Sequence, residues 1–361
     1  MNYDAILITS FGGPEAPADV MPFLENVLRG KNVPRERMLQ VAEHYYRFGG
    51  KSPINEQTRR LIAALKAELA EHGSRLPVYW GNRNWHPLLA DAILQMKKNG
   101  VRRALAFVTS AYSSYSGCRQ YRENIARAQE AAGPGAPVVD KIRVFHNHPG
   151  FIEALVDRVQ QALAKLPEDR PDAAQLIYTA HSIPLAMAQG CRYEEQLKES
   201  GRLVAEGLRH GSWRLVYQSR SGPASQPWLE PDILDYLREY KARADGSAVV
   251  IAPIGFVSDH MEILFDLDTQ ARELCDELGL QMVRAETVGT HPRFVRMIRE
   301  LICERLDETK PRLALGSLPP RPDFCPVDCC LVPAQPVASR SGDGTNMIGT
   351  SRLRCSTFDS R

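Results

Sequence analysis

Short apolar runs alternate with longer segments of helical periodicity along most of this chain. The runs are rich in β-branched and aromatic residues, which is typical of buried strands. They occupy residues 5–10, 76–82, 103–112, 138–145, 175–180, 213–219, 247–256 and 281–287. Between them, apolar residues recur three and four positions apart, as on one face of a helix. Strands that alternate with helices in this way predict an α/β fold built on parallel sheets.

The alternation occurs twice and predicts two similar α/β domains. The first covers residues 1–148 and the second residues 149–312, with the boundary near His148-Pro149-Gly150. A helix over residues 291–308, capped by its His-Pro pair, is expected to close the second domain. Residues 313–335 form a proline-interrupted, cysteine-bearing segment, and residues 336–361 lack apolar periodicity, so we expect the latter to be a disordered tail.

Composition indicates a folded enzyme rather than a nucleic-acid-binding or membrane-spanning protein. Of the 361 residues, 43% are hydrophobic and 24% charged, and 45 basic against 43 acidic residues leave a net charge of +2. No long basic tract predicts nucleic-acid binding. The first residues lack a basic signal-peptide region and no apolar run could span a bilayer, so we expect a cytoplasmic protein. Eight cysteines in such a chain argue against a disulfide framework.

Polar side chains follow the apolar runs of the second half. His181 stands where the run before TAHSIP ends, and ligands bind beyond the carboxyl ends of strands in open α/β sheets. After the run SAVVIA, helical spacing puts Glu262, Asp266, Gln270 and Glu273 on one face of a helix expected to start near residues 258–259. That face is either a path for cations or protons or an ordinary solvated surface. An imidazole beside a carboxylate suits proton abstraction or transfer of a divalent metal.

The first strand runs into the glycine-rich stretch FGGPEAP. The G-x-G-x-x-G spacing of dinucleotide sites is absent, and Pro14 and Pro17 remove amide donors that a phosphate would need. The stretch therefore indicates a tight turn that lets the backbone approach something flat or bulky.

Taken together, seven motifs resemble those of ferrochelatases, enzymes that insert ferrous iron into a porphyrin during haem synthesis. They are SFGGPE (10–15), FLENVLRG (23–30), YYRFGGKSPIN (45–55), TSAYSSYSGCRQY (109–121), TAHSIP (179–184), YQSRSGP (217–223) and DHMEILFDLD (259–268). The resemblance covers residues 3–312 and implies two Rossmann-like domains with a cleft between them. It implies porphyrin and Fe²⁺ as substrates, and enzymes acting later in the haem pathway as candidate partners.

The resemblance also assigns roles to individual residues. His181 is expected to accept protons or bind the metal, with Glu262 as its partner and Asp266 continuing the acidic row. Gln270 stands where family members often have a carboxylate, which departs from the family pattern. On the opposite face of the porphyrin, Phe11 would lie over the metal and has no ligating atom. Arg29, Ser52 and Tyr121 are the expected propionate contacts.

Cys325, Cys329 and Cys330 crowd into CPVDCC, and thiolates so close in a reducing compartment indicate a metal site, either structural zinc or a [2Fe–2S] cluster. The resemblance implies the [2Fe–2S] cluster, because some ferrochelatases hold one with three C-terminal cysteines and one from an internal motif. YSGC nominates Cys118 as the fourth ligand, with Cys191 as the alternative. The cluster would pin the C-terminal segment to the first domain in a structural or sensory role.

Other functions remain open from the sequence. A haem or porphyrin carrier would need the same binding surface without the proton acceptor, and an iron–sulfur electron carrier would explain CPVDCC alone. A cobalt or nickel tetrapyrrole chelatase would use the same imidazole and carboxylate. The sequence leaves protoporphyrin IX and coproporphyrin III both open as the porphyrin, with N-terminal motifs closer to the coproporphyrin type.

Overall fold

The computed structural model describes residues 2–31, 33–167, 174–222, 225–243 and 248–332, and the statements below refer to these residues. The expected disordered tail and the last three residues of the cysteine-bearing segment lie outside them. No helix of this part of the chain is long and apolar enough to cross a membrane.

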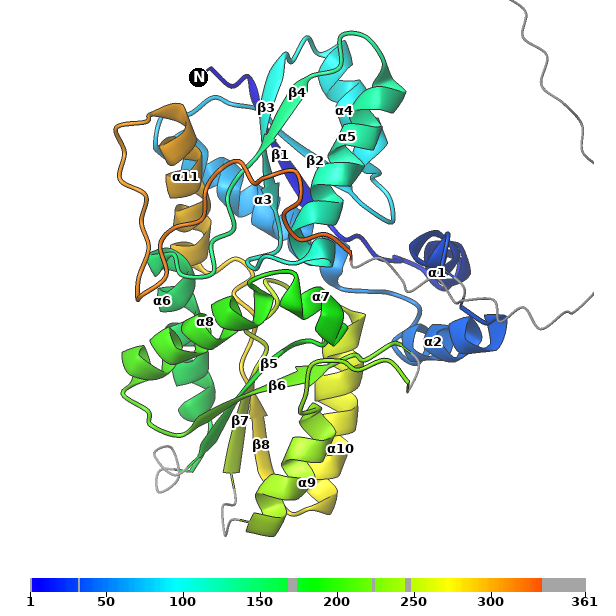
Figure 1. Ribbon diagram of the computed structural model, residues 1–361, viewed down its shortest axis with the longest axis vertical. Coiled ribbons are helices and arrows are strands. Elements are labelled where there is room, and N and C mark those ends of the chain that lie inside the picture. Colours follow the sequence, from blue (N-terminus) through cyan, green and yellow to red (C-terminus); the bar gives the residue numbers. More distant parts are fainter. Residues whose placement is uncertain (1, 32, 168–173, 223–224, 244–247, 333–361) are drawn as a thin grey trace, which may run out of the picture.

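Two four-stranded parallel sheets form the centre of the molecule, one above the other in Figure 1. In the first sheet, β1 (Ala5–Ser10) and β3 (Arg103–Val108) lie between β2 (Val78–Asn82) and β4 (Val138–Lys141). In the second, β5 (Gln175–His181) and β7 (Ala248–Ala252) lie between β6 (Trp213–Gln218) and β8 (Gln281–Arg284). This confirms the predicted α/β class. Several strands end earlier than the apolar runs, because pairing stops where the chain turns into the loops beyond the sheet.

Helices cover both faces of each sheet, which is why the central strands are buried except at one end of β3 and of β5. In the first half, α4 (Leu89–Lys98) and α5 (Gln120–Ala132) pack on the face formed by Ala5 and Leu7, and α3 (Ile54–Glu71) packs on the face formed by Ile6 and Ile8. In the second half, α6 (Pro149–Leu163) and α8 (Tyr193–Leu208) cover one face, and α9 (Ile233–Arg243) and α10 (Arg272–Glu277) cover the other.

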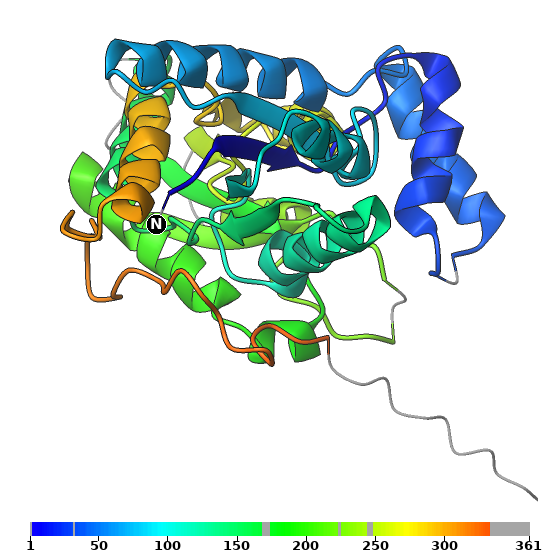
Figure 2. The same cartoon turned by 90° about the horizontal axis from the view of Figure 1, so that it is seen from above.

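Two further helices, α1 (Val20–Leu28) and α2 (Arg35–Arg47), form a pair set apart from the first sheet, as Figure 2 shows. They have their own small core around Phe23, Leu24 and Met38. Short helical segments complete the fold: η1 (Pro17–Asp19), η2 (Tyr115–Arg119), α7 (Leu185–Gln189) and η3 (Ile263–Ala271).

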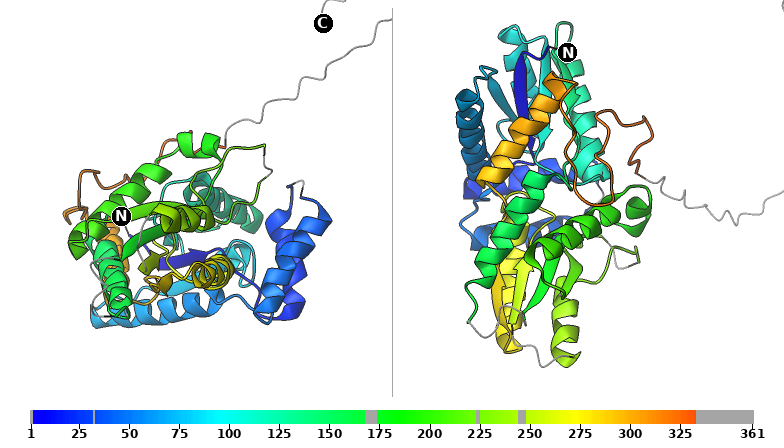
Figure 3. Two further views of the ribbon diagram at one scale, coloured as in Figure 1. Left: turned by 90° about the horizontal axis from the view of Figure 1, so that it is seen from below. Right: turned by 90° about the vertical axis from the view of Figure 1, so that its left-hand side faces the viewer.

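The last helix, α11 (Pro292–Leu306), begins as predicted, with His291 as the cap whose side chain accepts a hydrogen bond from the Arg293 amide. It does not pack on the second half alone: it lies along α3 of the first half as well as α6 (Figure 1). The large core cluster is correspondingly shared by both halves. The chain then returns across the first half as an irregular segment that ends beside α5 and α7 (Figure 3).

Candidate active site

The site is built from residues at the carboxyl ends of strands in the second sheet. His181 is the last residue of β5 and is paired with Gln218, the last residue of β6. The loop after β7 leads to a helical turn at Met261, later than the start expected near residues 258–259. These elements bring His181 Nε2 to 3.6 Å from Glu262 Oε1, and the two side chains are 32% and 46% exposed. The sequence-predicted pair is therefore brought together and remains accessible.

The imidazole of His181 is oriented by its backbone surroundings. Its Nδ1 forms a hydrogen bond with the carbonyl oxygen of Ser182, so Nδ1 carries a proton and Nε2 faces Glu262. The hydroxyl of Tyr193 donates to the backbone carbonyl of His181 at 3.1 Å, which holds the strand end in place.

Burial and mutual attraction set the charges of the pair. Burial alone would lower the pKa of His181, but the adjacent Glu262 carboxylate outweighs it and raises the pKa to about 9. Burial would raise the pKa of Glu262, and the His181 imidazolium instead holds it well below its usual range. The substrate-free site consequently holds an imidazolium–carboxylate pair at neutral pH.

His260 is a second imidazole at the site that the sequence reasoning missed. Its Nδ1 lies 3.7 Å from Glu262 Oε2, and burial lowers its pKa. Glu262 is thus flanked by two histidines, one charged and one neutral. The motif DHMEILFDLD could have indicated it, because it places His260 two residues before Glu262.

The acidic row continues only as far as Asp266. Residues 263–271 form a π-helix rather than the expected α-helix, a rare geometry that is frequent at functional sites. Asp266 accepts hydrogen bonds from Ser219 and, at 3.3 Å, from Gln218 Nε2. Burial raises the pKa of Asp266 to about 6. Glu273 lies beyond the π-helix on α10 and is exposed, as a solvated residue would be.

The residues expected to contact the porphyrin are spread over the first half. Phe11 follows β1 and packs against Phe23 with ring centroids 6.3 Å apart. Ser52 and Tyr121 are buried, whereas Arg29 is exposed at the end of α1. The predicted tight turn is present at Gly12, where φ is +81° and a Cβ atom would lie 2.9 Å from Asn82 Cβ.

Contacts between the halves bring α2 and α3 of the first half against the segment that carries Glu262. Tyr45 on α2 packs against Phe23 at 5.8 Å, and burial, with the nearby charge of Glu262, raises its pKa. His44 stacks on Phe265 of η3 with ring centroids 3.6 Å apart. The Asp259 amide donates to Gln57 Oε1 at 2.8 Å. Elements that follow β1 therefore pack against those that follow β7.

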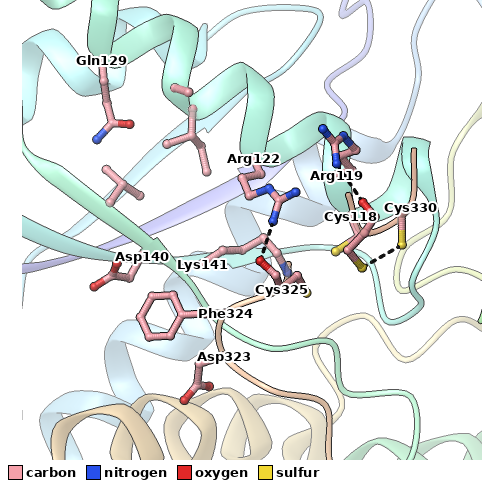
Figure 4. A pocket seen from close by; sticks show the side chains of 14 residues that line it. Cys118, Arg119, Arg122, Gln129, Asp140, Lys141, Asp323, Phe324, Cys325 and Cys330 are labelled. Carbon is pink, nitrogen blue, oxygen red and sulfur yellow. Dashed lines mark hydrogen bonds between the residues drawn. The ribbon is translucent and has the colours of Figure 1, made fainter. Parts of the chain in front are cut away.

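The cysteines form a second constellation on the first half. A cavity of about 290 Å³ is lined by Cys118 on η2 and by Cys325, Cys329 and Cys330, as Figure 4 shows for three of them. Cys329 Sγ and Cys330 Sγ are 3.5 Å apart. Arg119 donates to the carbonyl of Cys329 at 3.0 Å, and Arg122 donates to that of Cys325 at 3.3 Å.

The thiols influence one another electrostatically. Burial, followed by the neighbouring cysteines, raises the pKa of Cys325, and burial with Cys329, Cys118 and Cys191 raises that of Cys330. Cys191 therefore also lies near this group. A metal ion could be held by three or more His, Cys, Asp or Glu side chains whose ligand atoms lie within 4.8 Å of one another. Among the described residues, Glu68, Glu71 and His72 meet this criterion, and the cysteines do not.

Comparison with known proteins agrees with this architecture. The fold resembles that of SirB from Bacillus subtilis with Fe³⁺, which superposes with a TM-score of 0.51 at 11% identity, covering 84% of this chain and 98% of that one. The ferrochelatase family model matches residues 3–306. A ferrochelatase of Rhodopirellula baltica is 59% identical over 91% of this chain and 93% of its own. The chain belongs to the ferrochelatase family.

Other relatives carry a more specific name. The coproporphyrin III ferrochelatase of Streptomyces coelicolor is 49% identical over 94% of this chain and 96% of its own, and that of Mycolicibacterium smegmatis is 51% identical over 88% and 94%. The protein is an enzyme that inserts Fe²⁺ into a porphyrin in haem synthesis. This confirms the predicted activity over the carrier and electron-transfer alternatives.

Proposed function

We propose that this ferrochelatase acts on coproporphyrin III and that His181 and Glu262 perform the metal insertion. The relatives from Streptomyces coelicolor and Mycolicibacterium smegmatis are coproporphyrin III ferrochelatases, which supports coproporphyrin III as the substrate. The observation that carries the site is the 3.6 Å approach of His181 Nε2 to Glu262 Oε1 at the carboxyl ends of the strands.

Metallation replaces two pyrrole N–H protons by Fe²⁺, so the site has to accept protons beside an incoming cation. The pair holds one proton before the reaction, and His181 becomes an acceptor when Nε2 has released that proton to solvent, to which both side chains are partly exposed. Fe²⁺ favours this release because two adjacent cations repel each other. Asp266, with its pKa near 6 and its hydrogen bond from Ser219, is the next group on the row that can hold a proton or a cation.

On the other face of the macrocycle, Phe11 supplies an aromatic surface with no ligating atom, so we assign it to packing. Arg29, Ser52 and Tyr121 are proposed contacts for the propionates, with Arg29 able to pair bidentately with a carboxylate.

The substrate proposal is tested with purified protein, Fe²⁺ and either coproporphyrin III or protoporphyrin IX under anaerobic conditions. Loss of the free-base absorption spectrum reports insertion. We expect a higher kcat/KM with coproporphyrin III. A higher value with protoporphyrin IX would refute the choice of porphyrin while leaving the ferrochelatase activity intact.

We further propose that Cys118, Cys325, Cys329 and Cys330 hold a [2Fe–2S] cluster. Four thiols line one cavity, and Arg119, Arg122 and Lys141 line it too, so cationic groups are at hand for the thiolate charge. A cluster would supply a covalent connection between η2 and the C-terminal segment. The expected role is structural or sensory, and no step of metallation passes through it.

Anaerobically purified protein tests this site. We expect coloured protein with iron and acid-labile sulfide in equal amounts, and loss of both in Cys118→Ser. Cys191→Ser is the matched control and should keep the colour. Colourless protein with stoichiometric zinc would refute the cluster, and colour that survives Cys118→Ser but not Cys191→Ser would refute the choice of Cys118.

A further inference from the structure

Arg83 is a half-buried arginine between two residues of the proposed porphyrin surface. It follows β2, and its amide donates to the Ser10 carbonyl at 2.9 Å. The guanidinium carbon lies 5.4 Å from the centre of the Phe11 ring and 5.5 Å from that of Tyr121. Arg83 Nη1 donates to the carbonyl of Ser116 at 3.1 Å. Two aromatic faces and one carbonyl therefore hold the guanidinium in place.

No aspartate or glutamate of the described chain forms an ion pair with this guanidinium. Burial lowers the pKa of Arg83, and the ionisable groups that influence it are Tyr121, Tyr115 and Arg127. Lys31 is also close enough that Arg83 contributes to lowering the pKa of its ammonium group. Burying a cation without an anion costs free energy, so the arrangement is unfavourable unless a ligand supplies the negative charge.

A carboxylate suits this position. The planar guanidinium offers five N–H donors, and the bond to Ser116 uses one of the two on Nη1. The remaining donors can bind a carboxylate bidentately, which a lysine could not do. The nearby Lys31 adds to the positive potential and attracts an anion.

We propose that Arg83 binds a propionate carboxylate of the porphyrin and thereby favours porphyrins rich in carboxylates. This inference rests on the proposed function, because it requires Phe11 and Tyr121 to face the macrocycle. Arg83 would be a porphyrin contact in addition to Arg29, Ser52 and Tyr121. It lies in the loop after β2, where the sequence predicted no contact.

The experiment measures binding without metal, by quenching of porphyrin or protein fluorescence. The ligands are coproporphyrin III and its tetra-amide, which has the same macrocycle without carboxylates. Arg83→Leu should weaken coproporphyrin III binding about tenfold or more, the size expected for losing hydrogen bonds between charged groups, and leave the tetra-amide unchanged. Arg83→Lys should recover part of the affinity. Arg75→Leu, at an exposed arginine before β2, changes the net charge equally and should leave both affinities unchanged.

Turnover with Fe²⁺ adds a second measurement: in Arg83→Leu, KM for coproporphyrin III should rise more than kcat falls. If Arg83→Leu weakened the binding of coproporphyrin III and of its tetra-amide equally, the proposal would be overturned. Arg83 would then affect binding by maintaining the shape of the site rather than by contacting a carboxylate. Unchanged affinity in Arg83→Leu, with turnover retained by the wild type, would refute this inference alone. A wild type that prefers protoporphyrin IX would refute the proposed substrate, whatever Arg83 does.

Discussion

At the residue scale, the charge of His181 depends mainly on Glu262, with smaller contributions from the Ser182 backbone and Asp266. Its pKa is raised although the ring is partly buried, because Glu262 stabilises the imidazolium. Replacing Glu262 with Gln removes that stabilisation and leaves the effect of burial, so we expect the pKa of His181 to fall in the metal-free variant. Titration of the imidazole by NMR measures this. A pKa of His181 that does not move would contradict the assigned cause.

The same shift predicts how metallation depends on pH. A group with a raised pKa stays protonated to a higher pH, and only neutral imidazole accepts a proton. The wild-type rate should therefore rise with pH through the raised pKa of His181. In Glu262→Gln the rise should occur at lower pH, with a much lower maximum, since an amide supplies no charge for the metal. Initial rates at constant ionic strength provide the measurement. A wild-type rate in the variant would contradict the catalytic assignment and indicate that Glu262 is an ordinary solvated surface residue.

Removal of the imidazole separates chemistry from binding. His181→Ala should abolish metallation and leave porphyrin affinity within roughly tenfold, about 1.4 kcal/mol, because the ring acts on protons or metal rather than on the macrocycle. Fluorescence titration and the spectrum of the free-base porphyrin report the two effects. Turnover retained by this variant would refute the assignment.

At the scale of elements, η3 places Asp266 behind the imidazole–carboxylate pair. Its carboxylate is held by Gln218 and Ser219 at the end of β6, so its position depends on both this strand end and η3. We expect Asp266→Asn to raise KM for Fe²⁺ several-fold with little change in KM for the porphyrin, because a cation loses a carboxylate on its approach. Asp276→Asn, at the exposed end of α10, is the control. An increase confined to the porphyrin KM would show that Asp266 does not act on the metal.

At the scale of the whole molecule, one buried ion pair joins the two halves to the C-terminal segment. Arg143, after β4, donates to Glu304 of α11 through Nε at 2.9 Å, and the side chains are 1% and 4% exposed. Arg143 also donates to the Leu313 carbonyl at 2.9 Å, and the Leu313 amide donates to Glu304 at 3.2 Å. The pair therefore ties together three parts of the chain that are distant in sequence.

Breaking this pair should destabilise the protein strongly. Glu304→Gln leaves Arg143 buried without its anion, and we expect the free energy of unfolding to fall by about 3 kcal/mol. Glu286→Gln breaks the Arg158–Glu286 pair, in which Glu286 is 61% exposed, and should cost less than about 1 kcal/mol. Urea unfolding followed by circular dichroism compares the two. Equal effects would mean that Arg143 is stabilised in another way.

The sequence by itself determined the strands, most of the helices and the position of His181 at a strand end. These features are local: burial on both faces of a strand selects an apolar run, and a helix that buries one face selects a period near 3.6. The His-Pro cap of α11 was likewise readable, because it involves residues next to one another. Cys325, Cys329 and Cys330 could be grouped for the same reason.

Only the tertiary structure decided which residues meet across the chain. Arg83 between Phe11 and Tyr121, and α11 against α3, join segments whose contact leaves no period in the sequence. The π-helix over residues 263–271 also departs from the expected α-helix, because its composition is compatible with either geometry. A charged side chain such as Arg83 or Arg143 has the same sequence signature at a surface and in a buried site. Its surroundings depend on packing between distant elements, and the folded chain alone supplies them.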